Sequence, residues 1–194
     1  MTNSTIYQDI ATRTAGDIYI GVVGPVRTGK STFIKSFMEQ LVLPKLADSP
    51  KKARIADELP QSGSGRMIMT CQPCFIPGEG AAEIELSDHM KAKVRMVDSV
   101  GFLIPGAEGA GEGEEARMVS TPWAENDIPF AEAAALGTRK VMEDHANVGL
   151  VVTCDGTVAD LPRSAYTQAE ETVIRQMKQT GKPFSLVLNL SLIH

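Results

Sequence analysis

Apolar residues along the chain gather in short continuous runs that are separated by polar or glycine-rich segments. The runs at residues 17–24, 148–154 and 184–189 are rich in Val, Ile and Leu. The first run is typical of a strand that is buried in a parallel sheet, and the other two predict further strands, with 184–189 as the last strand of the sheet. Two shorter segments, 82–86 and 93–98, predict further strands that pair across the turn at 87–91.

Three other segments have the periodicity of amphipathic helices. In residues 30–43, Phe33, Phe37 and Leu41 recur every four residues as the expected buried stripe, and Pro44 ends the helix. The other two helices span 131–144 and 164–180, and the second is followed by the stop signals Gly181 and Pro183. Their expected inward positions are Ala134, Ala135, Thr138, Val141, Met142 and His145 in one, and Ala169, Val173, Ile174 and Met177 in the other.

Two polar stretches, 44–77 and 102–130, are predicted to be long loops. Long loops in compact domains are usually functional. Strands and helices otherwise alternate along the chain. This alternation predicts an α/β fold, a three-layer sandwich around a mainly parallel sheet.

The composition and net charge of the chain limit the classes of function that it can have. The chain has 194 residues, 43% hydrophobic and 22% charged, which suits one domain with its own core. A net charge of −5 argues against nucleic acid as a partner. No signal peptide and no transmembrane run of about 20 apolar residues is present, so a cytoplasmic location is expected.

Three cysteines, Cys71, Cys74 and Cys154, cannot all pair, which fits a reducing compartment. The first two form a C-x-x-C motif. It has no second cysteine pair and no neighbouring histidine, so neither a zinc site nor redox chemistry is expected there.

The strongest motif is GPVRTGKS at residues 24–31, which matches the phosphate-binding P-loop pattern G-x-x-x-x-G-K-[ST] in full. It lies between a predicted strand and a predicted helix, as a P-loop requires. Backbone N–H groups from Arg27 to Ser31 are expected to surround the β-phosphate of a nucleoside triphosphate. Lys30 is expected to bridge the β- and γ-phosphates, and the Ser31 hydroxyl to ligate Mg²⁺. The predicted nucleotide-binding residues are Gly24, Arg27, Thr28, Gly29, Lys30, Ser31, Thr32 and Gly101.

The side chain of Arg27 has two open interpretations. It either neutralises phosphate charge or faces solvent.

A second motif, D-x-x-G, follows the apolar segment 93–98 and comprises Asp98 to Gly101. An acid at the end of a strand beside a P-loop is expected to hold Mg²⁺ through a water molecule. Gly101 is expected to leave its N–H free for the γ-phosphate. Regulatory P-loop NTPases usually have a glutamine after this motif, which orients the attacking water. Phe102 occupies that position, so either hydrolysis is slow or another group or subunit orients the water.

Thr70 lies between the first helix and the following strands, where this class of NTPase has a threonine. Its hydroxyl would coordinate Mg²⁺ and its N–H would sense the γ-phosphate. The alternative is that Thr70 is simply a polar loop residue. The predicted catalytic residues are Lys30, Thr70 and Asp98, and the predicted metal ligands are Ser31, Thr70 and Asp98.

Several longer stretches resemble the stage IV sporulation protein A family, the ATPases of the spore coat basement layer. They are DIYIGVVGPVRTGKSTFIK, DELPQS, MVDSVGFLIPGA, STPW, IPFAEAAALGTRKVMEDH and GKPF, spread over about residues 9–189. STPW and the IPF…GTRKV segment after it are not general features of P-loop proteins. The resemblance is therefore specific and covers nearly the whole chain.

The resemblance implies a GTPase-like, TRAFAC-type P-loop NTPase that uses ATP with Mg²⁺. It further implies ATP-driven self-association into polymers on the mother-cell side of the forespore surface. Other coat morphogenetic proteins and a membrane-curvature peptide would bind regions that lie beyond these residues. The family tends to have a second threonine after the sensor threonine. Cys71 stands at that position here.

The resemblance also sets the expected boundaries. Residues 1–16 would be an N-terminal lead-in, residues 17–189 a P-loop NTPase domain that is truncated at its C-terminus, and residues 190–194 a non-native tail. Asn189 would begin the N-K-x-D motif of guanine-specific NTPases, but Leu190 and Leu192 occupy the Lys and Asp positions. The choice of ATP over GTP therefore depends on the resemblance.

Two other functions remain open at this point. The first is a regulatory GTPase-type molecular switch, which nucleotide preference would distinguish. The second is a small-molecule kinase, which needs an arginine-rich lid. The glycine- and glutamate-rich segment after Phe102 has only Arg117, so the kinase ranks last.

Overall fold

The computed structural model describes residues 17–46, 49–60, 72–87, 90–107, 111–112, 115–158 and 161–190. Within these residues the main sheet has six strands in the order β10-β9-β1-β4-β2, with β3 also paired to β4. Strands β10, β9, β1 and β4 run parallel to one another, and β2 and β3 run antiparallel to β4. Their bounds are β1 Asp17–Val23, β2 Cys74–Ile76, β3 Ala82–Ser87, β4 Met90–Asp98, β9 Val148–Cys154 and β10 Phe184–Asn189.

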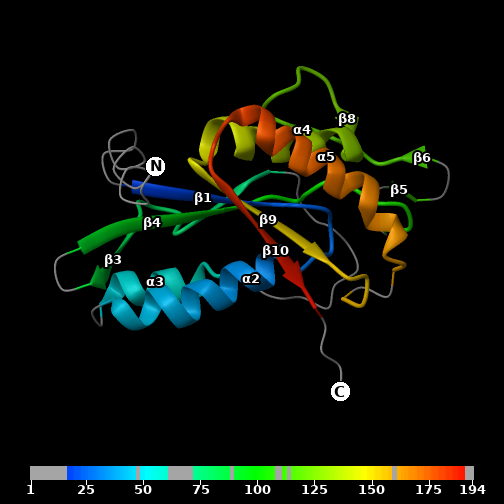
Figure 1. The fold of residues 1–194 in the computed structure, drawn as a ribbon. Coiled ribbons are helices and arrows are strands. Elements are labelled where there is room, and N and C mark those ends of the chain that lie inside the picture. The colour runs from blue at the N-terminus through cyan, green and yellow to red at the C-terminus, as the bar shows by residue number, and fades with distance from the viewer. Residues whose placement is uncertain are drawn as a thin grey trace.

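Helices cover both faces of this sheet (Figure 1). One face carries α2 Lys30–Phe37, which continues as the π-helix Met38–Val42 and the 3-10 turn Leu43–Lys45, together with α3 Pro50–Asp57. The other face carries α4 Phe130–Lys140, its π-helical extension Val141–His145, and α5 Ser164–Thr180. A separate apolar core fills each side of the sheet. The fold is thus α/β with a mostly parallel sheet, as predicted.

The segment before α4 contains two short two-stranded sheets. Their strands are β5 Gly111–Glu112, β6 Glu115–Ala116, β7 Met118–Val119 and β8 Ile128–Pro129. The prediction of one long loop over 102–130 was therefore wrong in part. The paired segments are only two residues long, which is too short for a hydrophobic alternation to appear in the sequence.

The prediction of a loop over 44–77 was also wrong in part, because this stretch contains α3 and β2. Ser49 caps α3 by accepting a hydrogen bond from the Lys52 N–H, and Pro50 occupies the first helical turn. Ile55 is the one buried residue of this helix. A single apolar position gives no periodicity, so only the Ser-Pro pair signalled the helix.

The first helix has a different buried stripe from the predicted one. Ile34, Met38 and Val42 are fully buried, whereas Phe33 and Phe37 are half-buried and Leu41 is exposed. In the segment 130–145 the inward positions are closer to the prediction: Ala134, Thr138, Val141 and Met142 are buried, and Ala135 and His145 are half-buried. The bounds of β9, α5 and β10 agree with those predicted.

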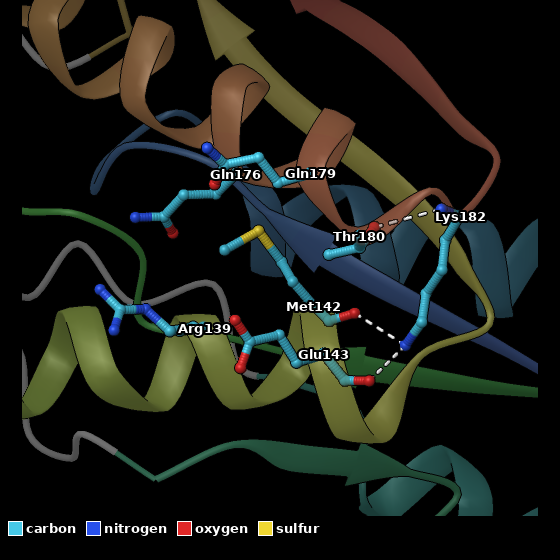
Figure 2. Close-up of a pocket in the computed structure, with 7 residues that line it drawn as sticks. All are labelled: Arg139, Met142, Glu143, Gln176, Gln179, Thr180 and Lys182. Carbon is cyan, nitrogen blue, oxygen red and sulfur yellow. Dashed lines mark hydrogen bonds between the residues drawn. The ribbon is translucent and has the colours of Figure 1, made fainter.

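A lysine joins the two helices on the second face at the amino ends of β9 and β10. Lys182 Nζ donates hydrogen bonds to the carbonyl oxygens of Met142, Glu143 and Ala146, and Figure 2 shows two of them. A cation there satisfies the carbonyls at the end of the helical segment Val141–His145. Burial lowers the pKa of Lys182, and Asp144 and Glu143 oppose that shift.

The carboxyl ends of the parallel strands meet at the opposite edge of the sheet. There β1 leads into residues 24–29, β4 ends at Asp98, β9 at Cys154 and β10 at Asn189. Val22 pairs in register with Asp98, and Asn189 with Cys154. In open α/β sheets ligands bind outside the carboxyl ends of the strands. This edge is therefore the first place to look for a site.

Candidate functional site

The loop between β1 and α2 is tightly curled. Gly24 has φ 146°, and a Cβ added there would lie 2.1 Å from the carbonyl oxygen of Val152, so only glycine fits. Arg27 and Gly29 have left-handed φ values of 60° and 88°. Gly29 then forms the N-cap of α2. Left-handed residues that lead into a helix N-terminus turn backbone N–H groups toward one point, which favours an anion.

Lys30 is buried at the start of α2. Its Nζ donates to the carbonyl oxygen of Pro25 at 2.6 Å, and the Thr28 hydroxyl donates to the same oxygen at 3.0 Å. Burial lowers the pKa of Lys30 to about 8, although the nearby Asp98 and Cys154 raise it. A buried ammonium group is poorly solvated, and it is stabilised by any anion that approaches.

Asp98 lies next to this lysine at the end of β4. The Ser31 hydroxyl donates to Asp98 Oδ2 at 2.6 Å. The other oxygen, Oδ1, is buried and has no hydrogen-bond partner in the described part of the chain. Burial raises the pKa of Asp98, and the Ser31 hydrogen bond and the Lys30 charge oppose that shift. An unpartnered buried carboxylate oxygen is costly, and a cation bound there would relieve that cost.

The oxygen donors of Ser31 and Asp98 fit Mg²⁺, which prefers hard oxygen ligands. No group of three or more His, Cys, Asp or Glu side chains suited to a metal exists among the residues that the structure describes.

The segment after β4 is joined to the loop after β1 by backbone hydrogen bonds. Val26 N–H donates to the Phe102 carbonyl at 2.9 Å, and Phe102 N–H donates to the Gly24 carbonyl at 3.2 Å. The Ser99 hydroxyl donates to the carbonyl of Val22 at 2.8 Å. The two motifs found in the sequence therefore form one continuous structure.

Gly101 differs from the expectation in one respect. Its N–H is not free, because it donates to the hydroxyl of Thr138 on α4 at 3.1 Å. The sequence placed Thr138 on the inward face of its helix but gave no sign of this contact, which joins residues 37 positions apart. Gly101 has φ 96°, and a Cβ there would lie 2.2 Å from the Gly24 carbonyl oxygen. A glycine is therefore required at this point.

Asn189 also reaches the loop after β1. Its Nδ2 donates to the Thr28 carbonyl at 3.1 Å, and a Cβ on Gly29 would lie 2.4 Å from that nitrogen. From the sequence, this asparagine was expected only as the first residue of a base-reading motif. Its position at the carboxyl end of the edge strand β10, level with the end of β9, was the available signal.

The remaining predicted residues divide into three groups. Arg27 is half-buried, and Thr32 is exposed on the first turn of α2. Thr70 lies outside the described residues, so its role as the sensor threonine stays a prediction, and Cys71 lies outside them as well. Cys74 pairs in register with Asp98, and His145 packs edge-on against Phe75 with ring centroids 5.4 Å apart.

A pocket of about 430 Å³ lies elsewhere, between the α4 segment and the C-terminal half of α5 (Figure 2). It borders the amino ends of the strands and contains none of the predicted nucleotide residues. Its lining residues are Arg139, Met142, Glu143, Gln176, Gln179, Thr180 and Lys182. In the described part of the chain no helix is long and apolar enough to cross a membrane.

Comparison with known proteins agrees with this geometry. A family model described as "Stage IV sporulation protein A, ATPase domain" matches residues 1–193. The chain is 54% identical over 187 residues to stage IV sporulation protein A of Clostridioides difficile (strain 630), covering 96% of this chain and 38% of that protein. It is 53% identical over 184 residues to the protein of the same name from Bacillus subtilis (strain 168), covering 95% of this chain and 37% of that protein.

The chain thus spans well under half the length of the curated relatives it matches. A match of this extent is sufficient to assign the family. It includes both the loop that leads to Lys30 and the strand that ends at Asp98. The chain belongs to the stage IV sporulation protein A ATPase-domain family.

Proposed function

We propose that this chain is the ATP-binding and ATP-hydrolysing part of a protein whose nucleotide-driven polymerisation forms the basement layer of the endospore coat. Membership of the ATPase-domain family supports nucleotide hydrolysis. The observation that carries the proposal is the buried Lys30, at the start of α2, beside a carboxylate oxygen of Asp98 that has no partner among the described residues. One group suits a phosphate and the other a metal ion.

The triphosphate would be held by the curled loop and the start of α2. Backbone N–H groups from Arg27 to Ser31 would donate to phosphate oxygens, and the helix N-terminus would add its partial positive charge. Gly24, Gly29 and Gly101 allow the backbone to approach closely, and Thr28 and Thr32 would contribute from the same segment. With a pKa of about 8, Lys30 is mostly protonated at neutral pH, and phosphate charge raises its pKa further.

Mg²⁺ would be held by Ser31 and Asp98, with Thr70 as a third proposed ligand. When bound, it would neutralise phosphate charge. The Ser31 hydroxyl can keep donating its proton to Asp98 while it offers an oxygen lone pair to a cation. Thr70 would also sense the γ-phosphate through its N–H.

The position that usually orients the attacking water is occupied here by a phenylalanine. Phe102 follows Gly101, and its half-buried ring packs against apolar residues of the cores around Val97 and Ile104. A phenyl ring neither donates nor accepts a conventional hydrogen bond, so it orients no water. We therefore expect slow hydrolysis, or orientation of the water by a group from another subunit. The second arrangement would couple hydrolysis to self-association.

Resemblance to the family supports a proposal for the finer architecture and the biological setting. We propose a GTPase-like, TRAFAC-type P-loop NTPase domain that acts on the mother-cell side of the forespore surface. Contacts with other coat proteins and with a membrane-curvature peptide would belong to regions beyond these residues. The names of the relatives state a sporulation role for those proteins.

Phosphate release is the measurement that tests the proposal. The longest chain that the source gene encodes should release phosphate from ATP in the presence of Mg²⁺. Lys30→Ala should abolish this release, and Lys35→Ala, which changes a partly exposed lysine on the same helix, should retain it. Equal phosphate release by the wild-type and Lys30→Ala proteins would contradict the proposal.

A regulatory GTPase-type switch is the second candidate. The contact of the Asn189 amide with the Thr28 carbonyl favours it, because it brings an asparagine at a strand end against the phosphate loop. The two candidates differ in the nucleotide base. ATP should compete with a labelled ATP analogue at least tenfold better than GTP does, and the reverse preference would support the switch.

A further inference from the structure

The loop after β4 has a partner on the second face of the sheet that the nucleotide site does not explain. Thr138 is buried on α4, and its hydroxyl donates to the Ala134 carbonyl within the same helix at 2.8 Å. The same oxygen accepts the N–H of Gly101 at 3.1 Å. A single hydroxyl therefore connects the D-x-x-G loop to a helix.

The two sides of Gly101 face different groups. The side of Gly101 on which a side chain would stand faces the loop after β1. A Cβ there would lie 2.7 Å from Lys30 Nζ and 2.2 Å from the Gly24 carbonyl oxygen. Its N–H points instead to α4. For that N–H to meet a phosphate held by Lys30, the peptide must turn away from Thr138. The φ of 96° belongs to a region that glycine enters freely, so such a rotation is accessible.

From this geometry we propose that Thr138 is a positioning residue that competes with the terminal phosphate for the N–H of Gly101. The proposal rests on the proposed function, namely that the loop after β1 binds ATP. A diphosphate lacks the γ-phosphate that would claim this N–H, and Thr138 keeps it. A triphosphate must replace the hydroxyl, and this exchange loosens the D-x-x-G loop from α4.

The competition makes a quantitative prediction about nucleotide discrimination. Thr138→Val keeps the shape of the side chain and removes the acceptor. It should raise the ratio of the ADP dissociation constant to that of a non-hydrolysable ATP analogue by about 2- to 10-fold, the range of one net hydrogen bond. Thr138→Ser keeps the hydroxyl, and its ratio should stay within about twofold of wild type.

The affinities are measured by calorimetry with Mg²⁺ on the longest chain that the source gene encodes. A purely structural role for Thr138 would change both affinities together and leave their ratio unaltered. Thr138→Ala is measured alongside, because it also removes the acceptor and serves if the valine variant does not fold. Its ratio should rise in the same way.

Three results would overturn the inference. In the first, wild type binds ATP, but the ratio of the ADP and ATP-analogue dissociation constants is unchanged in both Thr138→Val and Thr138→Ala. This result would leave the proposed function intact. Another is a Thr138→Ser protein whose ratio rises as much as that of the valine variant. The third is a wild-type protein that binds neither nucleotide, which overturns the proposed function and the inference with it.

Discussion

Replacing Lys30 by methionine should stabilise the protein while it destroys nucleotide binding. The wild-type ammonium group is buried, and the cost of that burial appears as a fall in the pKa of Lys30 from 10.5 to about 8. At about 1.4 kcal/mol per pKa unit this corresponds to roughly 3 kcal/mol at neutral pH. Methionine fills a similar volume without the charge. The Pro25 carbonyl keeps the Thr28 hydroxyl as a donor.

The assay is urea unfolding at pH 7 without nucleotide. Lys30→Met should raise the free energy of unfolding by about 1–3 kcal/mol, the lower part of the range allowing for the lost hydrogen bond to Pro25. Lys35→Met, a partly exposed position on the same helix, should change it by less than about 0.5 kcal/mol. With saturating ATP the wild-type protein should become more stable than Lys30→Met, because only the wild-type protein gains binding free energy.

Raising the pH provides an independent check. The pKa of Lys30 is about 8 in the folded protein and 10.5 for the unperturbed side chain, so the unfolded chain binds more protons between these values. Wild-type stability therefore rises with pH across this window relative to the variant, and the advantage of Lys30→Met should shrink. A variant less stable than wild type at pH 7, or an advantage equal at pH 7 and pH 10, would refute the reasoning.

Three further changes test other parts of the site. Asp98→Asn removes the charge that faces the metal, so the magnesium concentration for half-maximal hydrolysis should rise at least tenfold; an unchanged dependence would exclude Asp98 from the metal site. Thr70→Ala should leave nucleotide binding nearly intact and lower turnover, whereas an equal loss of both would indicate a role in loop structure. Gly24→Ala places a Cβ 2.1 Å from the Val152 carbonyl oxygen and should cost at least about 2 kcal/mol in urea unfolding; wild-type stability would show that the loop adapts.

The sequence predicted the strands at 148–154 and 184–189 and the helix at 164–180 with the bounds that the structure has. These are the elements with the clearest local signals. The strands are continuous apolar runs, and the helix ends where Gly181 takes a left-handed conformation. The spacing of GPVRTGKS likewise identified the curled loop, because backbone conformation there is dictated by its glycines.

The buried face of the first helix was less predictable. Phe33, Phe37 and Leu41 have the same spacing as Ile34, Met38 and Val42, one position away, so periodicity could not choose between the two stripes. Large aromatic side chains made the wrong stripe look more hydrophobic. Lys30 is buried at the start of the helix, and residues 30, 34 and 38 share one face. Burial of Lys30 therefore places Ile34 and Met38 on the buried face.

Contacts between segments that are distant in sequence were beyond local patterns. The Gly101 N–H bonds to Thr138, and the Asn189 amide bonds to Thr28 across 161 positions. Such contacts depend on the order of strands in the sheet, which neither spacing nor composition reveals. The motifs therefore predicted the chemistry of the site, and the strand order determined which further residues surround it.

The central claim is that the loop from Gly24 to Ser31 holds the phosphates of ATP. A crystal structure of the longest native chain with Mg²⁺ and a non-hydrolysable ATP analogue tests it most directly. The account predicts that Lys30 Nζ leaves the Pro25 carbonyl and lies about 3 Å from β- and γ-phosphate oxygens, with the metal ion beside Ser31 and Asp98. A nucleotide bound elsewhere, such as between α4 and α5, with Lys30 still on Pro25, would contradict it.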